Sequence, residues 1–292
     1  MTRMVKLFVY GTLRRDERNH RLLGCSSVDT QIAFAKGGLV DTGIGFPAMT
    51  LSMDRLVNGE LYEVGIEELL RVDVLEGFYG PGDSRNYYER MQIDVQTDKR
   101  VIKAWAYIQQ RPIQGQVIPY GDWKLYRMCE GQNILYFAYG SCMDLKRIEE
   151  AGVADWFTQV VGRGIINNCN LQFTRRTADG GRADIVETGG YTEGKLYYIP
   201  KQALEGYLYG REGVTGNIYR PIVITVQGEN GQRYEALTFV VVNKQEEVEP
   251  PNWYMEEILR GALPIVSKGY YLSLVDRFVS KFGYPLKEAE RG

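Results

Sequence analysis

The chain repeats a series of short motifs in the same order, once in each half of its 292 residues. Residues 5–13 read VKLFVYGTL and residues 134–142 read ILYFAYGSC, so each is an apolar run that ends in Tyr-Gly and then a small hydroxyl residue. A Gly-x-Leu-Tyr motif follows in each half, at 59–62 and at 194–197. Repetition of this kind predicts that one folding unit occurs twice in the chain.

The order of signals after these motifs is also repeated. Apolar residues at helical spacing follow each Gly-x-Leu-Tyr motif, with Pro200 in the first turn of the second helix, where proline is tolerated. Each helix ends in a Glu-Gly pair, Glu76-Gly77 and Glu212-Gly213. The distance from the motif leucine to this glycine is 17 residues in the first half and 18 in the second, so one extra residue in a helix or its cap accounts for the difference.

Two alternating apolar segments, typical of paired strands, complete each repeat. They cover residues 88–95 and 104–107 in the first half, and residues 219–226 and 236–239 in the second. The repeats predict two domains, 1–115 and 132–292, joined by a boundary segment near 110–132.

The second half continues beyond the repeat with two apolar stripes at helical spacing. One contains Met255, Ile258 and Leu259, and the other contains Tyr271, Leu274, Val275 and Phe278. A stripe of this width is typical of a helix that packs on a core, although it would also suit a groove for a partner. We interpret both as packing faces.

Charge and hydropathy exclude several classes of function. The formal net charge is −2 and no basic stripe is present, which gives no electrostatic basis for binding nucleic acid. No apolar run approaches the length that spans a bilayer, so no membrane association is expected. The N-terminal apolar run, 7–10, is too short for a secretion signal, and the expected location is the cytoplasm.

The cysteines and the histidine limit the chemistry further. The four cysteines, Cys25, Cys129, Cys142 and Cys169, are far apart and form no pair of metal-ligand spacing, so neither disulfides nor a zinc site is expected. His20 is the only histidine, and we expect it to be a surface residue at the start of a helix. A general base is therefore expected to be a carboxylate, a tyrosine or a lysine.

Two repeated features could carry chemistry. The Tyr-Gly-[Thr/Ser] turn can aim successive backbone N–H groups at one point and hold a carboxylate or an oxyanion, although it could also be an ordinary strand-to-loop turn. Glu76 and Glu212 each follow a helix C-terminus, where the helix dipole and partial burial raise the pKa of a carboxyl group. The alternative is a solvated carboxylate before a glycine cap.

The ordered motifs resemble those of the gamma-glutamylcyclotransferase superfamily over nearly the whole chain. The first half is similar to its gamma-glutamylamine cyclotransferase-like branch, in LFVYGTLRRDERNH at 7–20, FPAM at 46–49, GELYEV at 59–64 and DVLEG at 73–77. The second half is similar to its gamma-glutamylcyclotransferase branch, in FAYGS at 137–141, GGRADIV at 180–186, GKLY at 194–197 and REGV at 211–214, and in the later PNWY and GALP segments.

The resemblance implies an α+β fold: two tandem mixed β-barrels with flanking helices and a site at one mouth of each. It also implies an enzyme of the acyltransferase or lyase type that needs no cofactor and no metal. In this reaction the α-amine of a small γ-glutamyl substrate attacks the γ-carbonyl, 5-oxoproline forms and the amine leaves. The resemblance identifies neither the γ-glutamyl compound nor the oligomeric state.

The resemblance also assigns roles to residues. Glu76 and Glu212 match the family glutamate that acts as general acid and base. The substrate-binding residues that it implies are the two loops with their leading tyrosines, and the tyrosines that begin the strands after each helix: Tyr10, Gly11, Thr12, Leu13, Tyr88, Tyr139, Gly140, Ser141, Cys142 and Tyr219. The backbone amides of each loop are expected to hold the glutamyl group.

Two positions depart from the pattern or compete with it. Cys142 stands where the family loop usually has asparagine, which could remove a hydrogen bond to substrate; we do not expect a thiol nucleophile, because no histidine accompanies it. Glu205 precedes a glycine just as Glu76 does. Glu76 lies 17 residues after Gly59, whereas Glu212 and Glu205 lie 18 and 11 residues after Gly194, and we therefore prefer Glu212.

Two other functions stay open at this point. One or both domains could bind a γ-glutamyl metabolite without turnover, because a fold does not dictate an activity. The duplicated barrel could also be a scaffold, although a glutamate at the equivalent place in both halves argues against a purely structural role.

Overall fold

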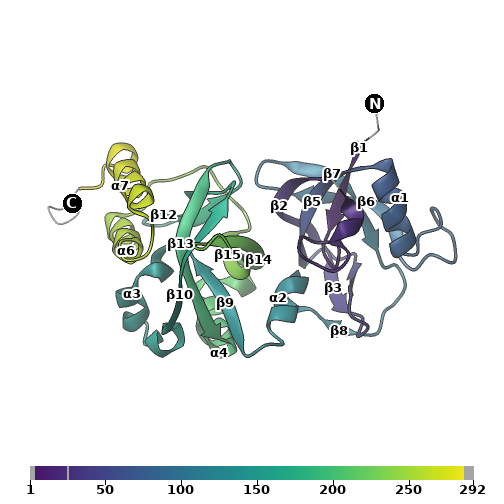
Figure 1. The fold of residues 1–292 in the computed structure, drawn as a ribbon, viewed down its shortest axis with the longest axis horizontal. Helices are drawn as coiled ribbons and strands as arrows, with labels where there is room; N and C mark the ends of the chain where they lie inside the picture. The colour runs from purple at the N-terminus through teal and green to yellow at the C-terminus, as the bar shows by residue number, and fades with distance from the viewer. Residues whose placement is uncertain (1–3, 25, 286–292) are drawn as a thin grey trace. The chain divides into compact units, whose positions relative to one another are not determined.

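The computed structural model describes residues 4–24 and 26–285, and the chain divides into two compact units, Met1–Met128 and Cys129–Gly292. Each unit contains a closed barrel of five strands with parallel and antiparallel pairs, flanked by short helices (Figure 1). The predicted α+β fold with two mixed β-barrels is therefore confirmed.

The first barrel has the strand order β1-β5-β2-β6-β7, in which β7 closes the barrel by pairing in parallel with β1. Its strands are β1 (Met4–Val9), β2 (Ser27–Lys36), β5 (Leu56–Gly65), β6 (Glu89–Gln96) and β7 (Val101–Ile108). The remaining strands of the unit form a small sheet, β3 (Gly38–Asp41), β4 (Pro47–Thr50) and β8 (Gln116–Val117). Its helices are η1 (His20–Leu23), α1 (Ile66–Leu75), η2 (Pro119–Gly121) and α2 (Trp123–Met128).

The second barrel repeats this circular order as β9-β13-β10-β14-β15. Its strands are β9 (Asn133–Ala138), β10 (Gln159–Asn167), β13 (Tyr191–Pro200), β14 (Tyr219–Gly228) and β15 (Arg233–Val241), with a separate hairpin of β11 (Asn170–Thr177) and β12 (Gly180–Val186). Its helices are η3 (Ser141–Met143), α3 (Leu145–Glu150), η4 (Ala154–Phe157), α4 (Lys201–Ala203), η5 (Leu204–Leu208), α5 (Tyr209–Arg211), η6 (Val214–Gly216), α6 (Asn252–Ala262) and α7 (Lys268–Phe282).

The strand registers align the two units residue by residue. Leu7 of β1 is paired with Tyr62 and with Trp105, and Tyr136 of β9 is paired with Tyr197 and with Leu237. Leu7 and Tyr136 are thus equivalent, and the two Tyr-Gly turns that follow three residues later occupy the same place in each barrel.

The glycine of each Gly-x-Leu-Tyr motif is required by packing inside the barrel. A Cβ on Gly59 would lie 2.6 Å from the Phe8 ring and 2.5 Å from the Val9 carbonyl oxygen. A Cβ on Gly194 would lie 2.7 Å from the Phe137 ring. All three distances are too short for a side chain at these positions. In both barrels, therefore, the motif glycine leaves room for an equivalent phenylalanine on the neighbouring strand.

A π-helical turn contains the extra residue of the second repeat. The segment α4-η5-α5 spans 201–211, one residue longer than α1, and its centre is the π-helical turn η5. A π turn closes hydrogen bonds over five residues instead of four and so accommodates one inserted residue. Pro200 is the N-cap of this helix and not a residue of its first turn, a correction of one position.

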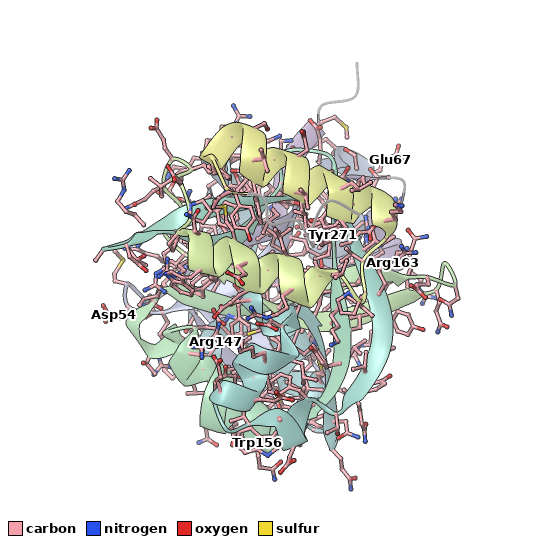
Figure 2. All side chains as sticks on the ribbon, turned by 90° about the vertical axis from the view of Figure 1, so that its left-hand side faces the viewer. Asp54, Glu67, Arg147, Trp156, Arg163 and Tyr271 are labelled. Atoms are coloured by element: carbon pink, nitrogen blue, oxygen red, sulfur yellow. The ribbon has the colours of Figure 1, made fainter. Side chains whose placement is uncertain are left out.

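The two apolar stripes at the end of the chain pack inward. Met255, Ile258 and Leu259 of α6 and Leu274 and Phe278 of α7 are all 3% exposed or less. The helices α6 and α7 lie side by side on the second unit (Figures 1 and 2). The interpretation of both stripes as packing faces is confirmed.

Residues 116–128 pack onto the first unit. The strand β8 extends the small sheet through β3, and the side chains of Ile118 and Trp123 are buried in the barrel core. Within the described residues, no helix is both long and apolar enough to cross a membrane.

Candidate functional site

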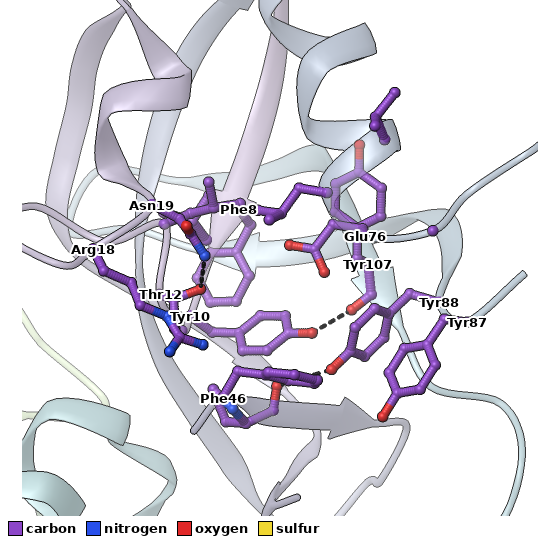
Figure 3. Close-up of a pocket in the computed structure, with 17 residues that line it drawn as sticks. Phe8, Tyr10, Thr12, Arg18, Asn19, Phe46, Glu76, Tyr87, Tyr88 and Tyr107 are labelled. Carbon is purple, nitrogen blue, oxygen red and sulfur yellow. Dashed lines mark hydrogen bonds between the residues drawn. The ribbon is translucent and has the colours of Figure 1, made fainter. Parts of the chain in front are cut away.

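The first unit contains a cavity of about 430 Å³ where the loop after β1 meets the end of α1 (Figure 3). Every residue that the sequence assigned to the first site lines it: Tyr10, Gly11, Thr12, Leu13, Glu76 and Tyr88. The rest of the wall is largely apolar and aromatic, and includes Phe8, Phe46, Tyr87 and Tyr107. A volume of this size suits a small-molecule ligand.

Two of the tyrosines that line the first cavity, Tyr10 and Tyr88, are fixed by hydrogen bonds to the backbone. The Tyr10 hydroxyl donates to the Tyr107 carbonyl oxygen at 2.5 Å, and the Tyr88 hydroxyl donates to the Pro47 carbonyl oxygen at 3.1 Å (Figure 3). Burial raises the pKa of both tyrosines, with the neighbouring Glu76 acting in the same direction. Both rings therefore stay neutral and form rigid walls.

The loop of residues 11–13 presents backbone donors to this cavity. Within residues 4–24 and 26–285, the N–H groups of Gly11, Thr12 and Leu13 have no backbone or side-chain acceptor. Asn19, which also lines the cavity, holds the loop in place, because its side chain donates to the Thr12 hydroxyl at 3.0 Å and its N–H donates to the Thr12 carbonyl oxygen at 3.0 Å. The amides are thus available to an anionic ligand.

Glu76 stands opposite these amides. It caps α1, and Gly77 follows with φ +63°, a left-handed conformation that ends the helix and favours glycine. Figure 3 shows the Glu76 carboxylate pointing into the cavity. It has no hydrogen-bond or ion-pair partner among the described residues, and burial raises its pKa to about 8. Such a group can both accept and return a proton near neutral pH.

A buried ion network fixes the residues that follow the loop 11–13. Arg14 lies 3.2 Å from a Glu60 carboxylate oxygen and 3.0 Å from an Asp122 oxygen, and all three side chains are at most 6% exposed. The Arg15 N–H donates to Glu60 at 2.8 Å. His20 begins η1 as predicted, but it is half-buried and its Nδ1 lies 3.1 Å from the Leu13 carbonyl oxygen.

The second unit holds a cavity of about 310 Å³ at the equivalent place. It is lined by every residue that the sequence assigned to the second site: Tyr139, Gly140, Ser141, Cys142, Glu212 and Tyr219. The tyrosine contacts repeat those of the first unit. The Tyr139 hydroxyl donates to the Phe239 carbonyl oxygen at 2.5 Å, and the Tyr219 hydroxyl donates to the Ala183 carbonyl oxygen at 2.7 Å.

Glu212 occupies the position of Glu76 but has a charged neighbour. Burial raises the pKa of its carboxyl group, while Arg211 and Arg175 oppose this shift. The Arg211 Nε lies 3.6 Å from the Glu212 carboxylate, and the other end of Arg211 donates to the Ser141 hydroxyl at 2.8 Å. The competing Glu205 is 58% exposed, lies near Lys201 and does not line the cavity.

Cys142 is buried, and burial raises the pKa of its thiol. A neutral, enclosed thiol is a poor nucleophile, and the absence of a nucleophilic role for Cys142 stays a prediction. Cys129, Cys142 and Cys169 form no disulfide, and Cys25 lies outside the described residues. The described residues contain no group of histidine, cysteine and carboxylate side chains that could hold a metal ion.

Several residues of the second cavity were not predicted from the sequence. Arg147, Arg175, Arg182 and Arg211 line it, as do Trp253, Tyr254 and Glu257 of α6. The Tyr254 hydroxyl accepts a hydrogen bond from the Ala183 N–H at 3.2 Å, beside the Tyr-Gly-Ser turn. Two features of the sequence point to some of these residues: Arg211 directly precedes Glu212, and the PNWY segment, which contains Trp253 and Tyr254, matches the family motif.

Comparison with known proteins agrees with the tandem fold. The chain is 39% identical, over 261 residues, to the gamma-glutamylcyclotransferase candidate YkqA of Bacillus subtilis (strain 168), with 88% of this chain and 91% of the relative covered. The chain belongs to the gamma-glutamylcyclotransferase family. Family models match a segment in each half of this chain, "Gamma-glutamyl cyclotransferase, AIG2-like" over 7–125 and "AIG2-like family" over 192–274.

Solved and named relatives extend this result. The crystal structure of Bacillus subtilis YkqA superposes with a TM-score of 0.82 at 37% identity, covering 96% of this chain and 99% of that structure. The gamma-L-glutamyl-butirosin B gamma-glutamyl cyclotransferase of Niallia circulans is 40% identical over 131 residues, which are 45% of this chain and 83% of that relative.

Proposed function

We propose that each unit is a functional domain that converts a γ-glutamyl amide to 5-oxoproline and a free amine, with Glu76 or Glu212 as the general acid and base. The glutamate takes a proton from the substrate's α-ammonium group, and the freed nitrogen attacks the γ-carbonyl carbon. The bond between that carbon and the leaving nitrogen then breaks as the glutamate returns the proton to the departing amine. The ring nitrogen gives up its second proton through the same carboxylate, so that the amine leaves as an ammonium ion.

One observation carries this proposal: an unpartnered carboxylate of raised pKa faces unpartnered loop amides across one small cavity. The amides suit the carboxylate of the glutamyl group, and Glu76 then lies where the folded substrate presents its ammonium. Because nucleophile and electrophile belong to one molecule, a cavity that holds the substrate folded supplies much of the rate. The proposed reaction uses no cofactor.

The test is turnover of a panel of γ-glutamyl compounds, with 5-oxoproline measured by mass spectrometry. The panel contains γ-glutamyl dipeptides, the isopeptide in which a γ-glutamyl group is attached to the lysine side chain, and γ-L-glutamyl-butirosin B, the last because one relative is named for that substrate. We expect Glu76→Gln to lower turnover in the first domain by about 100- to 10,000-fold, because glutamine cannot carry the proton. Substrate binding should weaken far less, because the loop amides remain.

Glu212→Gln tests the second domain in the same way, and Glu205→Gln is its matched control on the exposed side of the same helix. Undiminished turnover in the variant that carries both Glu76→Gln and Glu212→Gln would refute the assignment of the base.

For the second unit, the ion pair of Arg211 with Glu212 favours a second candidate, a binding domain without turnover. A nearby cation stabilises the ionised carboxylate and so weakens it as a base. The second candidate predicts that the Glu76→Gln variant binds γ-glutamyl compounds but releases no 5-oxoproline. If the Glu76→Gln variant releases 5-oxoproline, and the added Glu212→Gln substitution abolishes that release, the second candidate is excluded.

A further inference from the structure

The two cavities share one backbone frame but differ at equivalent side chains. Phe46 directly precedes Pro47, whose carbonyl oxygen accepts the Tyr88 hydroxyl, and Arg182 directly precedes Ala183, whose carbonyl oxygen accepts the Tyr219 hydroxyl. Phe46 and Arg182 thus occupy the same place, one in each cavity wall.

A second substitution of the same kind lies beside the glutamates. Leu75 precedes Glu76 and Arg211 precedes Glu212. At two equivalent positions, therefore, an apolar side chain of the first cavity is replaced by a guanidinium in the second.

The charge of the two walls differs accordingly. The first cavity is lined by one arginine, Arg18, and one glutamate, Glu76. The second is lined by four arginines and two glutamates, so its wall carries a net positive charge. A cavity whose wall carries a net charge of one sign concentrates ligands of the opposite sign.

Two of the four arginines already have partners inside the cavity. Arg211 contacts Ser141 and Glu212, and the Arg147 Nε lies 3.7 Å from a Glu257 oxygen. Figure 2 labels Arg147 below α6, the helix that carries Glu257.

The other two arginines belong to the hairpin β11-β12. Arg182 contacts only the half-exposed Asp179 among the acidic residues that the structure describes, and its guanidinium lies over the Trp253 ring, 5.0 Å from the centroid. Arg175 has no carboxylate within 4.0 Å in the described part of the chain. Arg175 and Arg182 are register partners on this strand pair, both line the cavity, and neither forms an ion pair with Glu212 or Glu257.

Building on the function proposed above, we propose that the second cavity selects γ-glutamyl compounds whose leaving amine carries two carboxylates, as in γ-glutamyl-glutamate, with Arg175 and Arg182 as the specificity residues. The loop amides hold the glutamyl group in both domains, so these arginines lie beyond what that group needs. The first cavity, with Phe46 at the equivalent place, takes an amine without such charge.

The test compares γ-glutamyl-glutamate with γ-glutamyl-glutamine, which has nearly the same size but one carboxylate fewer. In the Glu76→Gln variant, where only the second cavity turns over, we expect kcat/KM to favour γ-glutamyl-glutamate by about ten- to a hundredfold, the usual effect of one charge-assisted contact. Added salt should reduce this preference. In the Glu212→Gln variant, the preference should be absent.

Arg175→Gln and Arg182→Gln, each in the Glu76→Gln background, should remove the preference by raising KM for γ-glutamyl-glutamate alone. Arg175→Lys keeps the charge and should therefore retain part of the preference for γ-glutamyl-glutamate. This variant also controls for a folding defect caused by loss of the arginine. Arg176→Gln is the matched control, because Arg176 is the exposed neighbour on the same strand. An unchanged preference in both arginine variants would overturn the proposal.

Titration calorimetry on the variant with both glutamates replaced separates selectivity from catalysis. Tighter binding of γ-glutamyl-glutamate that depends on Arg175 supports the selectivity, even if the wild-type protein releases no 5-oxoproline and the proposed function fails. Equal binding of the two dipeptides overturns the selectivity, even if both are turned over.

Discussion

At the scale of single residues, the environment of Glu76 has a direct consequence for pH dependence. The Glu76 carboxyl has a pKa near 8 because it is buried without a partner. The proposed reaction needs its ionised form, so we predict that kcat/KM of the first domain, measured in the Glu212→Gln variant, rises from pH 6 toward about pH 8 and then levels. A rate that is flat over this range would exclude Glu76 as the group that must lose its proton.

The same raised pKa means that Glu76 destabilises the folded state once the pH exceeds the ordinary pKa of a glutamate, about 4.5. Between about pH 4.5 and pH 8 the folded state holds a proton that the unfolded state has lost, so the free energy of unfolding falls as pH rises. We predict that Glu76→Gln is more stable than the wild-type protein at pH 8, and that the difference shrinks toward pH 4.5.

Urea denaturation at several pH values measures this difference. Glu67→Gln is the control, because Glu67 is an exposed glutamate of the same helix. A stability difference that does not change with pH would show that burial of the Glu76 charge is not its source.

At the scale of elements, the network of Arg14, Glu60 and Asp122 joins the loop after β1 to β5 and to the start of α2. We predict that Arg14→Met lowers the free energy of unfolding by about 3–5 kcal/mol, because two carboxylates would lose their buried cation. Chemical denaturation checks the value, with the exposed Arg21→Met as control. A loss within the range of ordinary surface substitutions, about 0.5 kcal/mol, would contradict the prediction.

The elements were predictable from the sequence wherever the repeat was informative. The expected strand at 88–95 is β6 over Glu89–Gln96, and the extra residue inferred from the spacing is the π turn η5. The arginines of the second cavity were not predicted, because Arg147, Arg175 and Arg211 come from three separate elements. Their convergence depends on tertiary packing, which spacing along one chain does not encode.

At the scale of the whole molecule, each unit has its own barrel, its own cavity and its own candidate glutamate. We predict that the rates of 5-oxoproline release by the Glu76→Gln and Glu212→Gln variants add up to the wild-type rate on a mixture of γ-glutamyl compounds. Initial rates measured at one enzyme concentration test this. A sum well below the wild-type rate would show that the domains depend on one another.

The ion network also determines where the first unit can be separated from the rest of the chain. A recombinant fragment that stops at residue 115 would keep Arg14 and Glu60 but lose Asp122, together with the buried Trp123 ring. The Arg14 side chain would then be exposed to solvent. Water would also reach the side of the loop that Arg14 supports. Expression of the first unit as an independent protein should therefore extend to Met128, where the compact unit ends.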